Sequence, residues 1–196
     1  MVRRPGGGGG CERRRAAAVT VICLLVAPVA MAQIAPASHE ASYEQQVKAV
    51  FVYELTNYLR WPPDSSTAPF VIAVLGETVV VEPLREIAAK RKVGDREIVI
   101  RPVRSAAEAG DCQVLFIAST APASPEDVCQ AVAGKALLTI GEVTGFAARG
   151  VAVNFVLDEG RVKLEINLRA LRRAGIEPSS KLLKLARLVD DAGGEP

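Results

Sequence analysis

Hydrophobic positions follow two different periodicities along residues 42–140. Over residues 42–60 the apolar side chains recur at helical spacing, so Val47, Phe51 and Leu55 share one face. Residues 70–75 (FVIAVL) are apolar throughout, as in a strand that is buried on both faces of a sheet. The pattern continues with helices predicted at residues 78–91 and 124–133 and strands at 97–103, 112–117 and 136–140. Strands that alternate with helices predict a largely parallel sheet with helices on both faces.

The pattern changes after residue 140. Residues 151–157 and 161–166 predict two strands joined at Asp158-Glu159-Gly160, which indicates an antiparallel hairpin at one side of the sheet. Asn167 is a suitable N-cap for a short helix that ends at Gly175.

Ser179 is likewise a suitable cap for a final helix. The residues predicted along its apolar face are Leu182, Leu185, Ala186 and Val189. The expected fold is therefore α/β in three layers: a mixed, mostly parallel sheet of about six strands flanked by helices, with a C-terminal β-hairpin and two short helices. We expect a single domain over residues 42–190, preceded by a tether at 33–41 and followed by a tail at 191–196.

The first 32 residues have the pattern of a secretory signal. Five arginines precede an uncharged stretch at residues 16–30, and Ala30-Met31-Ala32 supplies the small residues of a cleavage site. Fifteen residues in a helix span roughly 22 Å, which is short of the ~30 Å hydrocarbon core of a membrane. The sequence therefore predicts a cleavable signal peptide at residues 1–32 and export to the periplasm.

Cleavage would leave two cysteines, Cys112 and Cys129, in a compartment that permits disulfides. A Cys112–Cys129 disulfide is one interpretation. The other is a buried Cys112 at the start of a strand and a separate Cys129 on a helix. The choice stays open because the sequence does not give the Cα separation that a disulfide requires.

Charge is distributed unevenly along the chain. The net charge is +2 for the whole sequence but −2 without the first 32 residues, so global charge gives no reason to expect nucleic-acid binding. Residues 160–187 carry a net charge of +6. Their bases are Arg161, Lys163, Arg169, Arg172, Arg173, Lys181, Lys184 and Arg187. This basic segment is either a surface for an acidic partner or anion, or a set of solvated helix faces that shield apolar residues.

The common catalytic patterns are absent from the sequence. It contains no G-x-S-x-G, no G-x-G-x-x-G and no Walker lysine loop. Its one histidine, His39, lies in the tether, and two mature cysteines are too few for a zinc site. The carboxylates Glu142, Asp158, Glu159 and Glu165 are interpreted as turn and surface acids. We expect no catalytic activity, no cofactor and no metal.

Several short stretches occur together in a characteristic order. The most specific lie at residues 165–186 and read E-I-N, A-G-I and S-S-K-L-L-K-L-A. The set resembles the YfiR/HmsC-like family of secreted bacterial proteins over about residues 44–189. The sequence departs from the family at Ala73, Gln113 and Gly141-Glu142, where cysteine, histidine and Ser-Asp are frequent. The resemblance implies that Ala73 removes one familiar disulfide partner of Cys112.

The resemblance implies a non-catalytic periplasmic regulator. Well-known members bind the periplasmic sensor domain of an inner-membrane diguanylate cyclase and restrain it, and an outer-membrane lipoprotein can sequester them. The output is cyclic-di-GMP and biofilm formation. Other relatives occur beside sensor kinases, so the partner is expected to be a membrane-bound cyclase or kinase.

A contact surface for such a partner is expected on the basic segment and next to Trp61. The candidate residues are Arg60, Trp61, Arg161, Lys163, Glu165, Arg169, Arg172, Arg173, Lys181 and Lys184. Trp61 has a second interpretation, as a side chain that seals the core. Glu165 would need a basic partner if it were buried.

The alternative function is periplasmic binding of a small anion at a helix N-terminus, near Asn167 or Ser179. A pocket lined by arginine and backbone N–H groups would favour it, whereas an exposed apolar patch rimmed by charge would favour partner binding. A homodimer remains open in either case.

Overall fold

The protein is described by a computed structural model that covers residues 37–63 and 67–191. The predicted signal peptide and the first residues of the tether lie outside the described part of the chain. No helix within it is long and apolar enough to cross a membrane.

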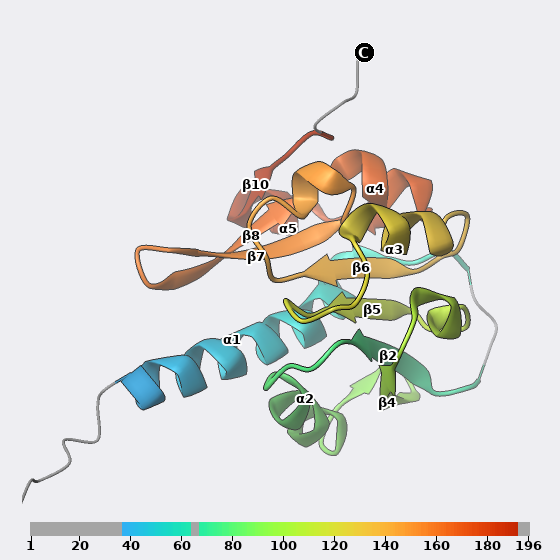
Figure 1. The fold of residues 1–196 in the computed structure, drawn as a ribbon. Coiled ribbons are helices and arrows are strands. Elements are labelled where there is room, and N and C mark those ends of the chain that lie inside the picture. The colour runs from blue at the N-terminus through green and yellow to red at the C-terminus, as the bar shows by residue number, and fades with distance from the viewer. Residues whose placement is uncertain (1–36, 64–66, 192–196) are drawn as a thin grey trace, which may run out of the picture. The chain divides into compact units, whose positions relative to one another are not determined.

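The main sheet has eight strands in the order β10-β8-β7-β6-β5-β2-β4-β3 (Figure 1). Its parallel centre consists of β2 (Phe70–Leu75), β4 (Arg96–Val103), β5 (Val114–Ile117), β6 (Leu138–Gly141) and β7 (Val153–Asp158). The hairpin strand β8 (Arg161–Ile166) is antiparallel to β7, and β3 (Lys92–Val93) is antiparallel to β4. The edge strand β10 (Ala186–Leu188) pairs in parallel with β8. The predicted fold class, α/β with a mostly parallel sheet and flanking helices, is confirmed.

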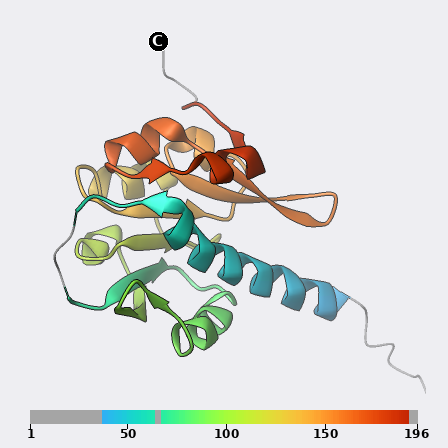
Figure 2. The same cartoon turned by 180° about the vertical axis from the view of Figure 1, so that it is seen from behind.

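Seven helical segments connect these strands in the described residues. They are α1 (Ala37–Tyr58), α2 (Val81–Ala88), η1 (Ala106–Ala109), α3 (Pro125–Ala131), η2 (Ala147–Arg149), α4 (Leu168–Arg173) and α5 (Ser180–Leu185). The helix α1 lies in front of the sheet in Figure 2, whereas α3 lies in front of the opposite face in Figure 1. A separate two-stranded ribbon joins β1 (Leu59–Arg60) to β9 (Glu177–Pro178) in antiparallel register.

Several local signals act as the sequence predicts. Ser124 caps α3 by accepting a hydrogen bond from the backbone N–H of Asp127, and proline takes the first helical position. Asn167 caps α4 through a 2.9 Å hydrogen bond from the backbone N–H of Ala170. The side-chain oxygen of Ser179 lies 3.3 Å from the backbone nitrogen of Leu182 and caps α5.

The C-terminal prediction is wrong beyond Leu185. The predicted final helix stops there, and Ala186–Leu188 form β10 because they pair with Leu164 to Ile166 of β8. The N-terminal helix also begins earlier than expected, at Ala37, so the last residues of the predicted tether are helical.

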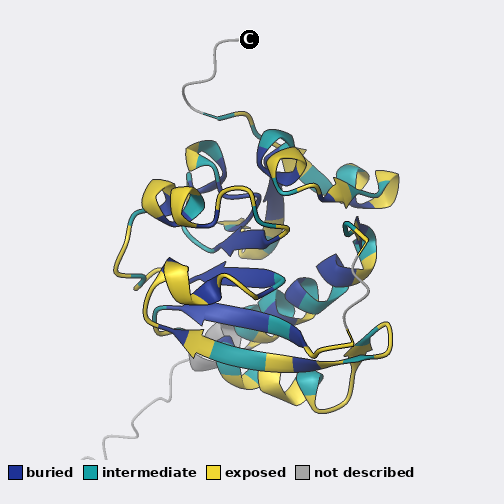
Figure 3. Cartoon of the chain, turned by 90° about the vertical axis from the view of Figure 1, so that its right-hand side faces the viewer, coloured by how far each residue is buried: buried dark blue, intermediate teal, exposed yellow. Residues whose placement is uncertain are grey.

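The sheet is covered on both faces, which gives two hydrophobic clusters. Along β2 the side chains of Phe70, Ile72 and Val74 join a cluster beneath α1, α2, α4 and α5. Ala73 and Leu75 point the other way, into a cluster beneath η1, α3 and η2. The alternation follows from strand geometry, in which successive side chains point to opposite faces. Figure 3 shows the buried strands between partly exposed helices.

The strand order reverses between β2 and β5. From β2 the chain passes through α2 to β4 on one side, and it then returns to β5, β6 and β7 on the other. The reversal puts the carboxyl ends of β2 and β5 side by side. In open α/β sheets this position is where ligands usually bind.

The hydrophobic cluster beneath α1, α2, α4 and α5, which is the larger of the two, leads to a stability prediction at Phe155. Its ring is 1% exposed and lies 6.2 Å from Phe51 and 6.5 Å from Phe116, centroid to centroid. Phe155→Ala is expected to lower the free energy of unfolding by about 3–5 kcal/mol, because it removes apolar contacts and leaves a cavity. Val99→Ala, at an exposed position on β4, is the control and should cost about 0.5 kcal/mol. Equal losses in urea unfolding would contradict the assignment of Phe155 to the core.

Candidate functional site

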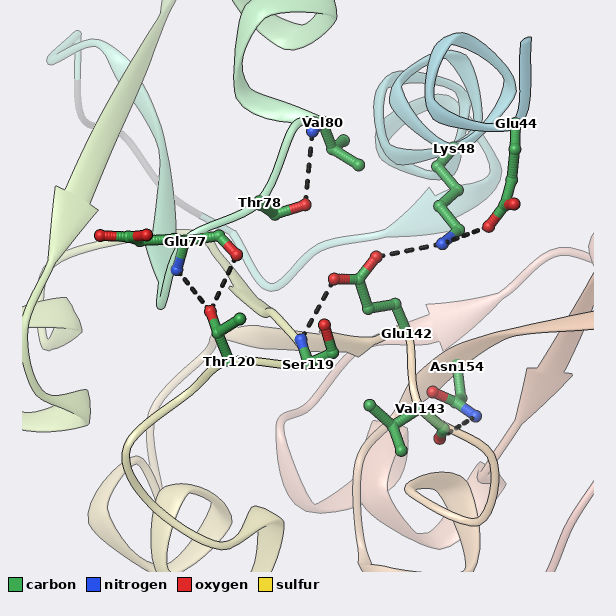
Figure 4. A network of polar contacts seen from close by, with 10 residues as sticks. All are labelled: Glu44, Lys48, Glu77, Thr78, Val80, Ser119, Thr120, Glu142, Val143 and Asn154. Carbon is green, nitrogen blue, oxygen red and sulfur yellow. Dashed lines mark hydrogen bonds and ion pairs between the residues drawn. The ribbon is translucent and has the colours of Figure 1, made fainter. Parts of the chain in front are cut away.

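A connected set of polar groups lies at the carboxyl ends of the parallel strands (Figure 4). Glu142 follows β6, and one of its carboxylate oxygens accepts a 3.1 Å hydrogen bond from the backbone N–H of Ser119, which follows β5. The other oxygen lies 3.0 Å from the Lys48 ammonium on α1, which also contacts Glu44 at 2.7 Å. The Lys48 and Glu142 side chains are 12% and 9% exposed. The set therefore ties α1 to the carboxyl edge of the sheet.

Lys48 remains charged in this position for an electrostatic reason. Burial alone lowers its pKa, but the hydrogen bonds and charges of Glu44 and Glu142 outweigh that effect and raise the pKa above its ordinary value. Such a charged triad holds elements together but offers no free acid or base.

The ends of β2 and β5 are joined directly. The Thr120 hydroxyl accepts a 2.7 Å hydrogen bond from the backbone N–H of Glu77 and donates a 2.8 Å bond to the Glu77 carbonyl (Figure 4). Gly76 has a φ of +91°, and a Cβ atom there would lie 2.8 Å from the backbone nitrogen of Ala121. Glycine permits both the backbone conformation and the close approach. At the reversal of strand order, the chain's own loops are thus packed together.

A second polar set is buried on the neighbouring strands β7 and β8. Glu165 is buried, and it forms an ion pair with Arg187 of β10 and accepts a 3.1 Å hydrogen bond from the Asn154 side chain. Asn154 is also buried and donates a 3.0 Å bond to the carbonyl of Val143. A buried Glu165 was expected to need a basic partner, and Arg187 is that partner. The structure therefore places Glu165 inside the fold, where it fastens β10 to β8.

The basic segment lies on β8, α4, α5 and β10, which are grouped in Figure 1. Some of its bases lie near acids of the same chain: Arg173 lies 3.0 Å from Asp191, whereas the exposed Lys163 lies at the longer distance of 4.0 Å from Asp158 and remains open to a partner. The Lys181 ammonium lies 5.1 Å from the ring centroid of Tyr58, a cation–π contact.

Other bases of the segment keep their charge at the surface. In the described residues, Arg172 and Lys184 are exposed and form no ion pair. Arg161 is exposed opposite Asp158 at the hairpin end, and Arg169 is half-buried near the start of α4. The basic segment therefore forms a positively charged surface at one end of the sheet, and several helices and strands contribute to it.

Three exposed leucines lie at the same end of the sheet. Leu157, Leu185 and Leu188 are 59%, 63% and 52% exposed. Leu157 and Leu185 line a groove of about 500 Å³ beside β8, which we call the β8 groove. Its charged lining residues are the bases Lys163, Lys184 and Arg187 and one acid, Asp158, so bases outnumber acids in the lining. An exposed apolar patch rimmed by charge is a common feature of protein-interaction surfaces.

Arg60 and Trp61 lie on and just after the β1–β9 ribbon. Arg60 is exposed and lies 3.2 Å from Glu177. The Trp61 indole N–H donates a 3.3 Å hydrogen bond to the carbonyl of Thr56, and its ring meets Phe70 edge to face at 5.4 Å. Trp61 is half-buried against the larger cluster, which supports its interpretation as a side chain that seals the core.

Cys112 and Cys129 are free thiols in the structure, so the Cys112–Cys129 disulfide is not formed here. Cys112 precedes β5, where its sulfur accepts a 2.8 Å hydrogen bond from Arg101, and burial raises its pKa. Cys129 lies on α3, and burial raises its pKa to about 11. Within residues 37–63 and 67–191, no three histidine, cysteine or acidic residues are grouped as metal ligands.

Sequence reasoning missed the β8 groove and the Lys48–Glu142 pair. Leu157 was assigned to a strand and Leu185 to a helix face, and nothing in the sequence showed that both side chains are exposed. Glu44 and Lys48 are four residues apart in a helix, which is a recognisable ion-pair spacing. The contribution of Glu142 depends on a contact across 94 residues and has no local signal.

The architecture defines a class, the doubly wound α/β domains. A conserved domain protein from Vibrio cholerae has this fold with a TM-score of 0.52 and 15% identity, and the match covers 74% of this chain and 59% of that one. The ABC domain in complex with L-Trp from Streptococcus pneumonia matches with a TM-score of 0.51, 12% identity, and coverages of 74% and 60%. These likenesses concern the fold alone, and the chain spans about three-fifths of the two structures.

Within this class, the chain belongs to the YfiR/HmsC-like family, whose model matches residues 45–187. The resemblance expected from the sequence is therefore confirmed. The family is regulatory and periplasmic, and membership supports a general role in cyclic-di-GMP signalling. The match begins within α1 and ends within β10, one residue before the strand ends at Leu188.

The raised pKa of Lys48 predicts a pH dependence of stability. Its contribution is fully present below the ordinary lysine pKa of 10.5 and is lost as pH rises through the higher value of the folded state. At neutral pH, Lys48→Met should lower the free energy of unfolding by about 1–3 kcal/mol, because Glu142 loses a charged hydrogen bond. The difference from wild type should shrink above pH 10.5. The control is Lys90→Met, at an exposed position. A difference that stays constant from neutral to strongly alkaline pH in urea unfolding would refute the assignment.

The two free thiols generate a chemical prediction. Because the pKa of each thiol is raised, Cys112 and Cys129 should react slowly with iodoacetamide in the folded protein at pH 8. In urea without reductant, both should be alkylated completely, as measured by mass spectrometry of the peptides that contain them. Recovery of a peptide pair linked through Cys112 and Cys129 would show instead that the exported protein carries the disulfide.

Proposed function

We propose that the protein binds the periplasmic domain of an inner-membrane diguanylate cyclase or sensor kinase and holds it inactive. The observation that carries this proposal is the β8 groove, where exposed leucines lie beside cationic side chains. Family membership supports the signalling context. The proposed output is cyclic-di-GMP synthesis and biofilm formation, with an outer-membrane lipoprotein as a second partner that could compete for the regulator.

The two parts of the groove serve different steps of binding. Complete burial of an exposed leucine contributes roughly 1.5–3 kcal/mol, so Leu157 and Leu185 supply affinity. Lys163 and Lys184 supply a positive field that accelerates association with an acidic surface. A regulator must also bind the inactive state of its partner more tightly than the active state, since equal affinity shifts no equilibrium.

The remaining candidate residues have secondary places in the proposal. Arg172 and Arg173 lie on α4; Arg173 pairs with Asp191, and the exposed Arg172 extends the positive surface. Arg60 is exposed but paired, and Trp61 is engaged with the core. The primary contact is therefore assigned to β8, α5 and β10.

Anion binding at a helix N-terminus has less support. Asn167 at the N-terminus of α4 and Ser179 at that of α5 each already accept a hydrogen bond from one of the backbone N–H donors that an anion would use. The carboxyl edge between β2 and β5, the usual ligand position of this fold, is closed by the contacts of Gly76 and Thr120.

The proposal predicts that the groove carries binding. The probe is the periplasmic domain of a membrane-bound cyclase or kinase encoded beside the gene for this protein. The double variant Leu185→Asp, Lys184→Glu should bind this domain at least ~10-fold more weakly than wild type, because it removes an apolar contact and reverses a charge. Both side chains are exposed, so the variant should keep its fold. Affinity is measured by isothermal titration with protein purified from the periplasm.

Two further variants locate the contact. Lys90→Glu, at the end of α2, is the matched charge-reversal control and should bind like wild type. Arg172→Glu with Arg173→Glu tests the α4 surface. If this variant loses binding while the groove variant retains it, the contact lies on α4 and the groove assignment is wrong. If wild type does not bind the cyclase or kinase domain at all, the proposed function itself fails.

A further inference from the structure

The outer edge of β8 is covered along only half of its length. The ladder with β10 pairs Ala186 with Leu164, Arg187 with Glu165 and Leu188 with Ile166. Residues 161–163 have β7 on one side and, in the described part of the chain, no strand on the other. Figure 1 shows this end of the hairpin projecting beyond the neighbouring strands.

The direction of the backbone N–H and C=O groups along β8 shows which residue at this edge has unpaired groups. The carbonyl of Ile166 points away from β7, because it accepts a 2.9 Å hydrogen bond from the backbone N–H of Val189. Backbone groups alternate in direction along a strand, so those of Leu164 and Val162 point the same way. On the β7 side, Asn167 confirms the alternation by donating a 2.9 Å bond to the carbonyl of Ala152. The N–H and C=O of Val162 therefore face outward at the uncovered edge.

The β8 groove lies alongside these free groups. It is lined by Leu157, Leu185 and Lys184 as well as by Lys163 of β8 itself. A chain that enters the groove can thus meet unpaired backbone donors and acceptors, apolar side chains and positive charge at once. An added strand uses this combination: main-chain hydrogen bonds give affinity, and side-chain contacts on alternate residues give specificity.

We propose that the partner inserts an extended, acidic segment that pairs with residues 161–163 of β8 and extends the line of β10. This inference rests on the proposed function, since it specifies how the partner occupies the β8 groove. The segment places acidic side chains beside Lys163 and Lys184 and an apolar side chain against Leu157 or Leu185.

The charges on β8 favour a strand from another protein at this edge and disfavour the β8 strand of a second copy. Antiparallel pairing of two β8 edges about Val162 would set Arg161 of one copy opposite Lys163 of the other. Like charges directly opposite each other destabilise a strand pair. Charged residues at a strand edge are also a known means of preventing self-association. The edge of β8 is therefore suited to pairing with an acidic strand, and pairing with β8 of a second copy is disfavoured.

A proline substitution tests the backbone contact directly. Val162→Pro removes the outward N–H, and proline is tolerated at strand edges where that N–H faces solvent. Val162→Thr keeps the N–H and the β-branched shape and is the matched control. The binding probe is again the periplasmic domain of a cyclase or kinase encoded beside the gene for this protein. We expect the proline variant to bind at least ~10-fold more weakly than wild type and the threonine variant to bind within ~3-fold of it. Thermal unfolding of both variants checks that the fold is retained.

Hydrogen exchange supplies a second readout that needs no variant. On addition of the partner domain, the amide of Val162 should become protected, whereas the protection of the Lys90 amide, which donates to the Ile87 carbonyl, should not change. If Val162→Pro lowers stability too far for a binding measurement, protection of this amide in the wild-type protein decides the question.

The outcomes separate the inference from the function on which it rests. In one outcome, wild type and Val162→Pro bind the partner domain, the groove variant does not, and the Val162 amide of wild type gains no protection. This outcome would overturn strand addition and leave the proposed function in place. Absence of binding by wild type would overturn both. Protection of Val162 in the protein alone, together with a dimeric mass, would show that a second copy occupies the edge and would also overturn the inference.

Discussion

The rest of the structure depends on one constraint: both faces of the parallel strands must be covered. The central strands β5 and β6 are fully buried, so their apolar side chains need helices on each side. The N-terminal helix α1 and the C-terminal helices α4 and α5 cover one face, and η1, α3 and η2 from the middle of the chain cover the other. Once the centre is closed in this way, the exposed leucines Leu157, Leu185 and Leu188 lie where the sheet ends. The β8 groove is located at such an end.

The sequence predicts the parts of the fold that rest on short-range patterns. The apolar run of β2, the hairpin turn at Asp158-Glu159-Gly160 and the caps at Ser124 and Asn167 each have a local physical signal, and each lies where expected. The final helix shows the limit of this reasoning. Leu182 and Leu185 have helical spacing, but the next residues pair with β8, and that long-range pairing determines their conformation. The Lys48–Glu142 contact likewise joins residues far apart in the sequence, so no local pattern could identify it.

The candidate site shows why a count of charges is only a partial guide to a surface. Eight bases in residues 160–187 suggested one positive face. In the folded chain, Arg187 neutralises the buried Glu165 and Arg173 lies against Asp191, so these two bases are engaged with the protein itself. Lys184 keeps an unpaired charge, and it does so next to Leu185, which sequence periodicity had placed in a core-facing row. The interaction surface is defined by this neighbourhood of free charge and exposed apolar area, which only the tertiary structure reveals.

The strand β10 is the least extensively held part of the sheet on this side. It has three ladder positions, and its fastening to the interior is the ion pair between Arg187 and Glu165. Segments with few contacts open at a lower free energy than the cooperative unit that contains the core. Each opening of β10 would double the length of free β8 edge, from residues 161–163 to residues 161–166. The length of β8 edge that an incoming strand can use therefore varies with time, and the Glu165–Arg187 pair and the Arg173–Asp191 pair both limit how often the longer edge is free.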